Sequence, residues 1–179
     1  MDQPTILLPA TDADVPAVVA LMNMAYRGRG AEAGWTTEAG YIAGTRITED
    51  LLRQDLAAKP DAAMLLCYGA DGVLLGCVWL EPEPDDVWYL GSLTVMPGVQ
   101  NAGLGRRILA AAEDWAAARG AREIRMSVVH LRDTLIAWYV RRGYRVGEET
   151  ARFPYGDERF GTPLRDDLHF IILRKRLMD

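Results

Sequence analysis

A glycine-containing turn joins an apolar stretch to the most strongly helical stretch of the chain. The turn reads Gln100-Asn-Ala-Gly-Leu-Gly105, and apolar side chains follow at helical spacing over residues 103–119. Gly103 and Gly105 place no side chain where the backbone enters this helix, and Arg106 adds positive charge. A helix N-terminus exposes unpaired N–H groups and the positive end of the helix dipole, so the turn predicts a phosphate site.

Two nucleotide-binding motifs contain similar glycines, and the sequence argues against both. Ile108 stands where the third glycine of a G-x-G-x-x-G motif belongs, and the turn does not follow the first strand of a doubly wound sheet. The chain has no G-x-x-x-x-G-K-[ST] phosphate loop. The remaining alternative is that the glycines only make a tight connection between a strand and a helix.

A second stretch, over residues 132–144, predicts a helix that ends at Gly143. Taken together with the turn, it resembles the GNAT N-acetyltransferase superfamily. That family has a Leu-x-Val-x-Pro strand, then a [QR]-x-x-G-x-[GA] turn, then a later helix that ends in Tyr-x-x-x-Gly-[FY]. The matching residues are Leu93, Val95, Pro97, Gln100, Gly103, Gly105, Tyr139, Gly143 and Tyr144.

The resemblance implies acetyl-coenzyme A (acetyl-CoA) as the cosubstrate and implies where it binds. The pantetheine arm would bond to the backbone of Leu93, Thr94 and Val95. Arg132 stands where the family often has an asparagine that contacts the cofactor, and we take the arginine as a cofactor contact as well. The residues implied for the pyrophosphate are Gln100, Asn101, Ala102, Gly103, Leu104, Gly105 and Arg106.

Tyr139 is predicted to be the general acid. Its ordinary pKa of about 10 keeps the hydroxyl protonated at neutral pH, so it can give a proton to the departing thiolate. The alternative is a core tyrosine on the apolar face of its helix, beside Leu135 and Trp138. We take the acid role as the main hypothesis.

The general base is less clearly marked. Some family members carry a glutamate on the strand before the turn, and the matching position here holds Tyr89. Glu81 is our candidate base, acting through water on an amine that is mostly protonated at neutral pH. Other carboxylates and a histidine remain open, and any of them can equally be a solvated surface charge. These alternatives are Glu83, Asp85, Asp86 and His130.

Loops with aromatic and charged side chains are predicted to bind the acceptor. Our candidate substrate residues are Trp35, Glu38 and Tyr155. Two chemistries stay open at this stage. Asp157 and Glu158 would suit a cationic amine, whereas Arg46 or Arg159 would suit a carboxylate. The alternative in each case is an ordinary surface loop.

The elements that must position these residues follow from apolar periodicity and from turn residues. The segment 152–167 contains two prolines and two glycines and is predicted to be a long functional loop. Residues 81–86 are predicted to be a polar turn, because prolines do not fit a central strand. We expect strands over 5–8, 63–68, 73–80, 87–96, 123–129 and 168–173, and helices after Thr11 or Asp12 and over 48–59, 103–119 and 132–142.

Composition narrows the class of protein. The formal net charge of −5 argues against a protein that coats nucleic acid or an anionic membrane. No signal peptide or membrane-spanning stretch is apparent. Cys67 and Cys77 stand in apolar runs without CxxC spacing, which predicts buried thiols, no activated nucleophile and a reducing, cytoplasmic location.

The sequence therefore predicts one N-acetyltransferase domain over residues 3–179. The expected fold is α+β and GNAT-like, with a mixed central sheet of about six to seven strands flanked by about four helices. The expected reaction is direct acetyl transfer from acetyl-CoA to a primary amine, most simply a small molecule, in a ternary complex without a metal. A non-catalytic acetyl-CoA-binding sensor or partner module, a protein N-terminal or lysine acetyltransferase, and a homodimer stay open.

Overall fold

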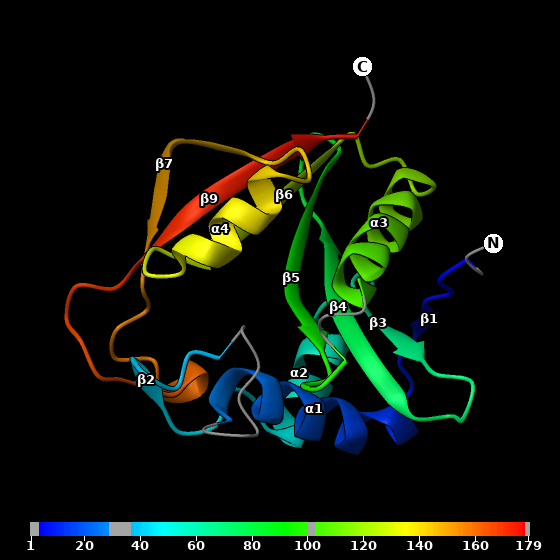
Figure 1. The fold of residues 1–179 in the computed structure, drawn as a ribbon, viewed down its shortest axis with the longest axis horizontal. Helices are drawn as coiled ribbons and strands as arrows, with labels where there is room; N and C mark the ends of the chain where they lie inside the picture. Colours follow the sequence, from blue (N-terminus) through cyan, green and yellow to red (C-terminus); the bar gives the residue numbers. More distant parts are fainter. Residues whose placement is uncertain (1–3, 29–36, 100–102, 178–179) are drawn as a thin grey trace.

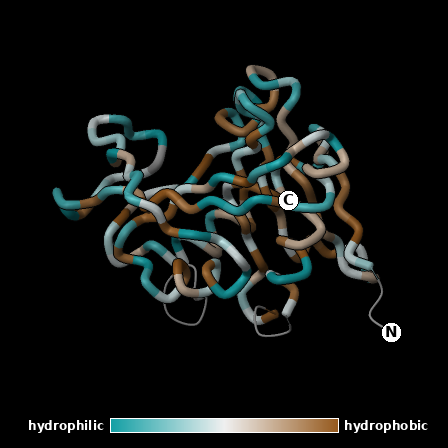
Figure 2. Tube along the Cα trace, turned by 90° about the horizontal axis from the view of Figure 1, so that it is seen from above, coloured by the Kyte–Doolittle hydropathy of each residue, from teal (hydrophilic) through white to brown (hydrophobic). Residues whose placement is uncertain are grey.

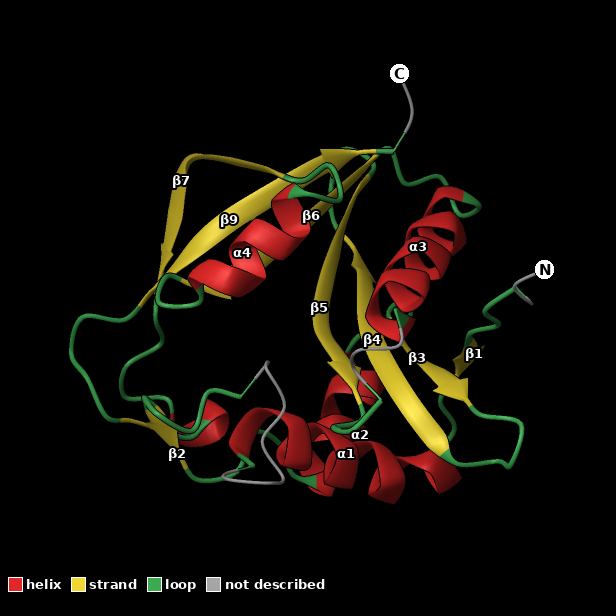
Figure 3. Ribbon diagram, viewed as in Figure 1, coloured by secondary structure: helices red, strands yellow, loops and turns green. Residues whose placement is uncertain are grey.

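The protein, described from a computed structural model, is defined over residues 4–28, 37–99 and 103–177. In these ranges a mixed seven-stranded sheet is flanked by four α-helices (Figures 1 and 3), which confirms the expected α+β fold. In sheet order the strands are β1 (Leu8–Pro9), β3 (Ala63–Tyr68), β4 (Leu74–Pro82), β5 (Val87–Val95), β6 (Glu123–Val129), β9 (His169–Arg176) and β7 (Arg145–Arg152). The helices are α1 (Val15–Arg27), α2 (Glu49–Ala58), α3 (Leu104–Ala117) and α4 (Asp133–Val140).

The alternation of apolar side chains along the strands gives the sheet two buried faces. In β3, Met64 and Leu66 belong to the cluster formed with α1 and α2, whereas Leu65 belongs to the cluster formed with α3 and α4. In β4, Trp79 follows the first pattern and Leu80 the second. Figure 2 shows the hydrophobic stretches running through the interior and hydrophilic ones at the outer turns. The sheet is therefore a layer between two pairs of helices.

The centre of the sheet opens where its two parallel strands separate. β5 and β6 pair only from Val87↔Glu123 to Tyr89↔Arg125, and every other neighbouring pair in the sheet is antiparallel. Beyond these pairs the two strands diverge (Figure 1). β5 also has a register shift against β4, and Ser92 at this shift has a φ of 53°. A bulge bends its strand and interrupts the ladder, so the open edge of β5 is bent at Ser92.

The predicted phosphate-binding helix is α3. Gly103 precedes its first residue and has a φ of 74°, a left-handed conformation that favours glycine. Leu104, Ile108 and Ala112 form the buried stripe expected from the sequence. The helix ends at Ala117 and is followed by a turn in which Gly120 has a φ of 95° and the Ala121 N–H donates to the Ala116 carbonyl at 3.0 Å.

Two short strands hold together the two long connections on one side of the sheet. In the sequence, β2 (Ile42–Ala43) follows α1, and β8 (Thr162–Pro163) comes after β7 and before β9. They pair as Ile42↔Pro163 and Ala43↔Thr162, and the Leu164 N–H donates to the Tyr41 carbonyl at 2.8 Å. We call this pair the β2–β8 strap. The segment predicted as a long loop therefore contains a strand that crosses to the other connection.

The structure corrects three element predictions. Glu81 and Pro82 belong to β4 instead of the turn, because β4 extends beyond its last pair with β3 (Leu80↔Ala63) and a proline there removes no hydrogen bond on that edge. β7 was not predicted, since nearly all of its side chains are exposed and it lacks an apolar alternation. The strand expected over 5–8 is only Leu8–Pro9. In the described ranges no helix has the length and apolar character needed to cross a membrane.

Candidate active site

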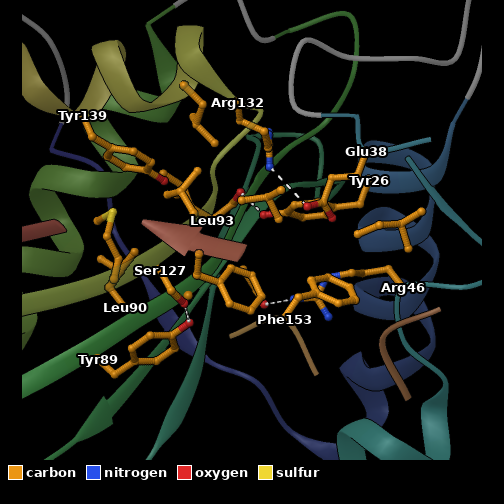
Figure 4. A pocket seen from close by; sticks show the side chains of 18 of the residues that line it. Tyr26, Glu38, Arg46, Tyr89, Leu90, Leu93, Ser127, Arg132, Tyr139 and Phe153 are labelled. Carbon is orange, nitrogen blue, oxygen red and sulfur yellow. Dashed lines mark hydrogen bonds and ion pairs between the residues drawn. The ribbon is translucent and has the colours of Figure 1, made fainter. Parts of the chain in front are cut away.

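The separation of β5 and β6 creates a cavity of about 290 Å³, which we call the central cavity (Figure 4). Residues of β5 and β6 form two of its walls. Tyr139 on α4 and Tyr26 on α1 project into it from two helices, and Phe153 comes from the connection after β7. Elements from both halves of the sheet therefore meet at one place that no single stretch of sequence contains.

Tyr139 is held firmly at the edge of this cavity. Its side chain is buried, and its hydroxyl points inward (Figure 4). The ring meets Trp138 edge-on at 5.0 Å and Tyr144 at 5.6 Å, measured between ring centroids. Burial raises the pKa of Tyr139 above its ordinary value, and Tyr26 nearby adds to this. The hydroxyl is therefore protonated at neutral pH, as a general acid requires.

A chain of hydrogen bonds supports the ring behind Tyr139. The Tyr144 hydroxyl donates to the Glu113 carboxylate at 3.0 Å, and Lys175 Nζ donates to the other oxygen of the same carboxylate at 2.7 Å. Tyr144 is 1% exposed. The family-like Tyr-x-x-x-Gly-Tyr segment thus places one tyrosine in the cavity and uses the other as a buried support.

The strand predicted to hold the pantetheine arm borders the central cavity through Leu93. The Leu93 carbonyl accepts a hydrogen bond from the Tyr26 hydroxyl at 2.9 Å. Thr94 and Val95 are buried and do not line the cavity, and the Thr94 hydroxyl donates to the Ser92 carbonyl at 2.8 Å. Any contact of these two residues with a ligand in the cavity must come from the backbone.

The predicted pyrophosphate turn is described only from Gly103 onward, and Gln100, Asn101 and Ala102 lie outside the described residues. Leu104 is buried and Arg106 is exposed at the start of α3. At Gly105 an added Cβ would lie 3.5 Å from Val95 and 3.7 Å from Trp138, so the first turn of α3 packs close to β5 and α4.

Positive charge gathers beside this helix start. The pKa of Arg142, just after α4, is lowered by burial and by the nearby positive charges of Arg141 and Arg106. The arginines at the start of α3 and the end of α4 therefore influence one another electrostatically. A helix N-terminus flanked by cations is suited to an anion.

A buried ionic cluster lies across the central cavity from Tyr139. Arg27 Nη1 donates to Glu38 Oε1 at 3.0 Å, and Arg132 Nη1 lies 3.8 Å from Glu38 Oε2. The three side chains are only 8–9% exposed. Glu38 was predicted to bind substrate and Arg132 to bind the cofactor, and the structure brings both into the same cavity.

Glu81, the candidate base, lies in a second cavity of about 260 Å³, which we call the side cavity. Alternation along β4 places it on the α1–α2 face with Trp79, whose Nε1 donates to Glu81 Oε2 at 3.1 Å. Lys59 Nζ lies 2.8 Å from Glu81 Oε1. Tyr139 belongs to the opposite face, so the structure does not bring the two predicted catalytic residues into one cavity.

The two cavities nevertheless adjoin. Arg46, Tyr89 and Ser92 line both of them. The Tyr89 hydroxyl is hydrogen-bonded to Ser127 Oγ at 2.9 Å. Tyr89, which stands where some relatives have a glutamate, therefore forms part of the wall between the two predicted catalytic groups.

Two predicted substrate residues, Trp35 and Tyr155, are absent from the described lining of the central cavity. Trp35 is outside the described residues. Tyr155 is 44% exposed, and its hydroxyl donates to the Arg165 carbonyl at 2.7 Å. Its ring lies 5.1 Å from that of Phe153, which does line the cavity. Tyr155 therefore contacts a residue that lines the cavity, Phe153, but does not itself line the cavity.

The alternative bases lie outside both cavities. Glu83 forms hydrogen bonds with Arg125, which lower the pKa of this carboxyl group. His130 stacks on His169 with ring centroids 4.0 Å apart. Asp85 and Asp86 have positive φ values in the turn before β5.

The cysteines are free and lie outside both cavities. Burial raises the pKa of Cys77 to about 12, and burial also raises the pKa of Cys67. Both are therefore thiols at neutral pH, and neither is activated as a nucleophile. Among the described residues, no group of three or more His, Cys, Asp or Glu side chains is placed to hold a metal ion.

Sequence reasoning missed Tyr26, Arg27 and Phe153 as site residues. Tyr26 lies in the helix expected after Thr11 or Asp12, and its hydroxyl contacts β5. Arg27 ends the same helix, and Phe153 lies in the segment 152–167 that was predicted to be a long loop. Nothing in their spacing indicates that they meet at the opening between β5 and β6.

Comparison with known proteins places this arrangement among acetyltransferases. No protein with a curated description matches the chain. Three solved structures share the fold. PaiA N-acetyltransferase from Thermoplasma acidophilum, in complex with coenzyme A, has a TM-score of 0.70 and 17% identity over 97% of this chain and 99% of its own.

The second is a ribosomal-protein-alanine N-acetyltransferase from Brucella melitensis, with a TM-score of 0.69 and 20% identity over 96% of this chain and 99% of its own. The third is a GNAT-superfamily phosphinothricin acetyltransferase from Sinorhizobium meliloti in complex with acetyl-CoA. Its TM-score is 0.70, with 12% identity over 98% of this chain and 90% of its own. The model of the acetyltransferase (GNAT) family matches residues 33–144, more than half of the chain, and the protein therefore belongs to this family.

Proposed function

We propose that this protein transfers the acetyl group of acetyl-CoA directly to the amine of a small molecule. The observation that carries the proposal is the central cavity at the opening between β5 and β6, with the protonated hydroxyl of Tyr139 pointing into it. In this arrangement the central cavity lies beside the bent edge of β5 and contains a group that can donate a proton to a leaving thiolate.

The residues around this opening fit acetyl-CoA. The N-terminus of α3 from Gly103 to Arg106, with Arg142 nearby, is suited to the diphosphate, and Gln100, Asn101 and Ala102 are proposed to complete this site. The edge of β5 from Leu93 to Val95 has no strand partner on the β6 side and can bond to the pantetheine amides. Two relatives of the same fold were solved with coenzyme A or acetyl-CoA. When bound, this cosubstrate supplies the activated acetyl group.

A small acceptor is favoured over a protein. The β2–β8 strap joins the two connections beside the central cavity, and Phe153 adds a wall. An extended peptide needs an open groove, and we expect the strap, whose Ile42 lines the cavity, to leave little room for one. Relatives of both kinds occur, since one is named for phosphinothricin and another for a ribosomal protein. The choice therefore rests on the strap and on the size of the cavity.

Direct transfer is favoured over a covalent enzyme intermediate, because both thiols are protonated and lie away from the cavities. In the proposed step the cationic amine first loses one proton to Glu81 through water in the side cavity. Its nitrogen then bonds to the carbonyl carbon, the carbon–sulfur bond breaks, and Tyr139 gives its proton to the sulfur. The second proton of the nitrogen leaves through water to solvent, and Tyr139 regains a proton from solvent. Acid and base thus act from opposite faces of the sheet. The two free thiols also support the predicted cytoplasmic location.

Two measurements test this proposal. Isothermal titration with acetyl-CoA should give one site per chain, and mixing with a panel of primary amines should release free thiol. Transfer to small amines should exceed transfer to peptides of matched N-terminal residues. Binding without thiol release on any amine or peptide would establish the non-catalytic alternative, and a preference for peptides would establish the protein acetyltransferase.

A further inference from the structure

Charged side chains converge on the central cavity. Among its described lining residues, Arg27, Arg46 and Arg132 are cations and Glu38 is the anion. Glu38 is hydrogen-bonded to Arg27. A buried charge is costly unless a partner of opposite sign satisfies it. An anionic ligand could act as such a partner for a buried guanidinium nitrogen that the described residues leave unsatisfied.

Arg132 is a buried arginine whose hydrogen-bonding groups are not all satisfied by the described residues. Its side chain is 9% exposed, and Nη1 lies 3.8 Å from Glu38, farther than a hydrogen bond reaches. Nη2 is buried and has no hydrogen-bond partner among the described residues. A planar guanidinium binds a carboxylate most strongly through two parallel N–H donors. Arg132 thus offers a buried donor, within the cavity, to an oxyanion (Figure 4).

A second guanidinium converges on the same wall. Arg46 and Arg132 lie against the ring of Tyr26, with their guanidinium carbons 5.4 and 5.9 Å from its centroid. Tyr26 in turn bonds to the Leu93 carbonyl, and Arg46 Nη2 lies 3.3 Å from Ser92 Oγ. The two cations therefore lie beside the bulge of β5, where the proposed transfer takes place.

We propose that the acceptor amine also carries a carboxylate or a comparable small oxyanion, as an amino acid does, and that Arg132 binds it with Arg46 beside it. This assignment rests on the proposed function and names its substrate class. The oxyanion would orient the acceptor, while the amine nitrogen attacks and the proton transfers described above are unchanged.

The same donor chemistry also suits an oxyanion of the cofactor, which is the role that the family resemblance implied for Arg132. The acceptor is favoured because the cofactor diphosphate has its own candidate site at the start of α3, beside Arg106 and Arg142. Arg132 instead faces Glu38 and Tyr26, on the α1 side of the cavity.

Matched acceptors separate the two roles. Amino acids and their carboxamides differ in the anionic group but share the amine. The wild type should have a higher kcat/KM for the acids, and Arg132→Gln should lose about ten- to a hundredfold on the acids and less than about twofold on the amides. The KM for acetyl-CoA should stay unchanged. Arg132→Lys, which keeps the charge but loses the planar fork, should recover part of the selectivity.

Arg165→Gln is the matched control, because Arg165 pairs with Asp167 at the surface, away from both cavities. Its acid-to-amide ratio should equal that of the wild type. Equal use of acids and amides by the wild type would overturn the assignment. A raised KM for acetyl-CoA in Arg132→Gln, with an unchanged ratio, would return Arg132 to the cofactor.

A binding measurement keeps this test independent of turnover. N-acetyl amino acids, the products, should raise the Tm of the wild type but not that of Arg132→Gln, and N-acetyl amino amides should shift neither. If no amine is acetylated but this pattern holds, the proposed activity fails while the oxyanion site stands. If the amines are acetylated and the acids give no Arg132-dependent Tm shift, the oxyanion site fails while the activity stands.

Discussion

The central and side cavities share a wall of β5 but treat charge differently. In the side cavity Asp55 pairs with Arg159 and Glu81 pairs with Lys59, while Arg46 lines both cavities. In the central cavity Arg27 and Arg132 contact one carboxylate, that of Glu38, and Arg132 Nη2 is buried without a hydrogen-bond partner among the described residues. Paired charges can stabilise a wall without selecting a ligand. A buried donor without a partner favours a ligand that can accept its hydrogen bond, so the proposed acceptor class depends on the central cavity.

The two cavities also differ in the groups they offer for proton transfer. The central cavity contains the buried hydroxyl of Tyr139, which burial keeps protonated. The side cavity contains the partly exposed carboxylate of Glu81. An acid benefits from exclusion of water, whereas a base that must release a proton to solvent benefits from access to it. The predictions below test this division of labour.

The largest effect is expected from Tyr139→Phe. Removing the proton donor should lower kcat by about 10²–10⁴-fold, with little change in the KM for acetyl-CoA. Folding should be nearly unaffected, because the ring contacts with Trp138 and Tyr144 remain. Steady-state thiol release measures the effect. Tyr68→Phe is the matched control, since the Tyr68 hydroxyl donates to Asp14 at the surface. An unchanged kcat in Tyr139→Phe would show that Tyr139 is not the general acid.

The next largest effect is on stability, from Glu38→Gln. The change removes the one carboxylate among the described charged residues of the central cavity and leaves Arg27 and Arg132 buried without it. Breaking a buried ion pair in this way costs about 3–5 kcal/mol. Urea unfolding should show this loss, and added sulfate or phosphate should restore more stability to the variant than to the wild type. A loss below about 1 kcal/mol would mean that the cluster behaves like a surface pair.

A smaller effect is expected from Gly103→Ala. Gly103 has a φ of 74°, and an added Cβ meets no atom within 4 Å, so the cost is conformational, about 1–2 kcal/mol. Relief of this strain should shift the start of α3 and raise the Kd for acetyl-CoA, measured by titration. Gly120→Ala, with a φ of 95° beyond the other end of α3, controls for strain alone. Equal acetyl-CoA affinities in the two variants would argue against a diphosphate site at Gly103.

Asp55→Asn should have a small effect. Asp55 and Arg159 are each about one-third exposed, so water screens their ion pair. The loss of stability in urea should stay below about 1 kcal/mol, clearly less than that for Glu38→Gln. If the two losses were equal, the contrast between the cavities in how they treat charge would disappear.

The smallest expected effect is on the alkaline side of the pH profile. Because burial raises the pKa of Tyr139, its protonated form persists to higher pH than an ordinary tyrosine's, and ionisation removes the acid only above that raised value. An unperturbed tyrosine would be half ionised at about pH 10. The kcat of the wild type should therefore show no decline up to pH 10, under conditions where circular dichroism reports an unchanged fold. A decline centred near pH 10 would contradict a buried acid.

Local patterns were sufficient to predict most of the fold. The apolar stripe of α3 and a helix beginning near Thr48 were both predicted; in the structure Thr48 caps α2, and its hydroxyl accepts from the Leu51 N–H at 3.2 Å. β7 was missed because exposed polar residues form it, and only its pairing with β9 makes it a strand. Glu81 and Pro82 were wrongly assigned to a turn, because a proline is incompatible with a strand only at positions where a neighbouring strand accepts a hydrogen bond from the backbone N–H.

The candidate site was predictable in part for the same reason. The glycine turn and Tyr139 belong to motifs of closely spaced residues, so they could be recognised from the sequence alone. Arg27, Glu38 and Arg132 are separated by up to about a hundred residues, and no spacing links them. Two substrate chemistries, a cationic amine and a carboxylate, were therefore equally open from the loops alone.

By itself the sequence predicted most of the order of the elements, the candidate phosphate-binding helix start and the candidate acid, because each depends on side chains that are neighbours along the chain. Only the tertiary structure decided that the opening between β5 and β6 becomes a cavity, that Glu81 and Tyr139 lie on opposite faces, and that Arg27 and Arg132 meet Glu38. The physical reason is that burial and charge balance depend on which distant segments pack together.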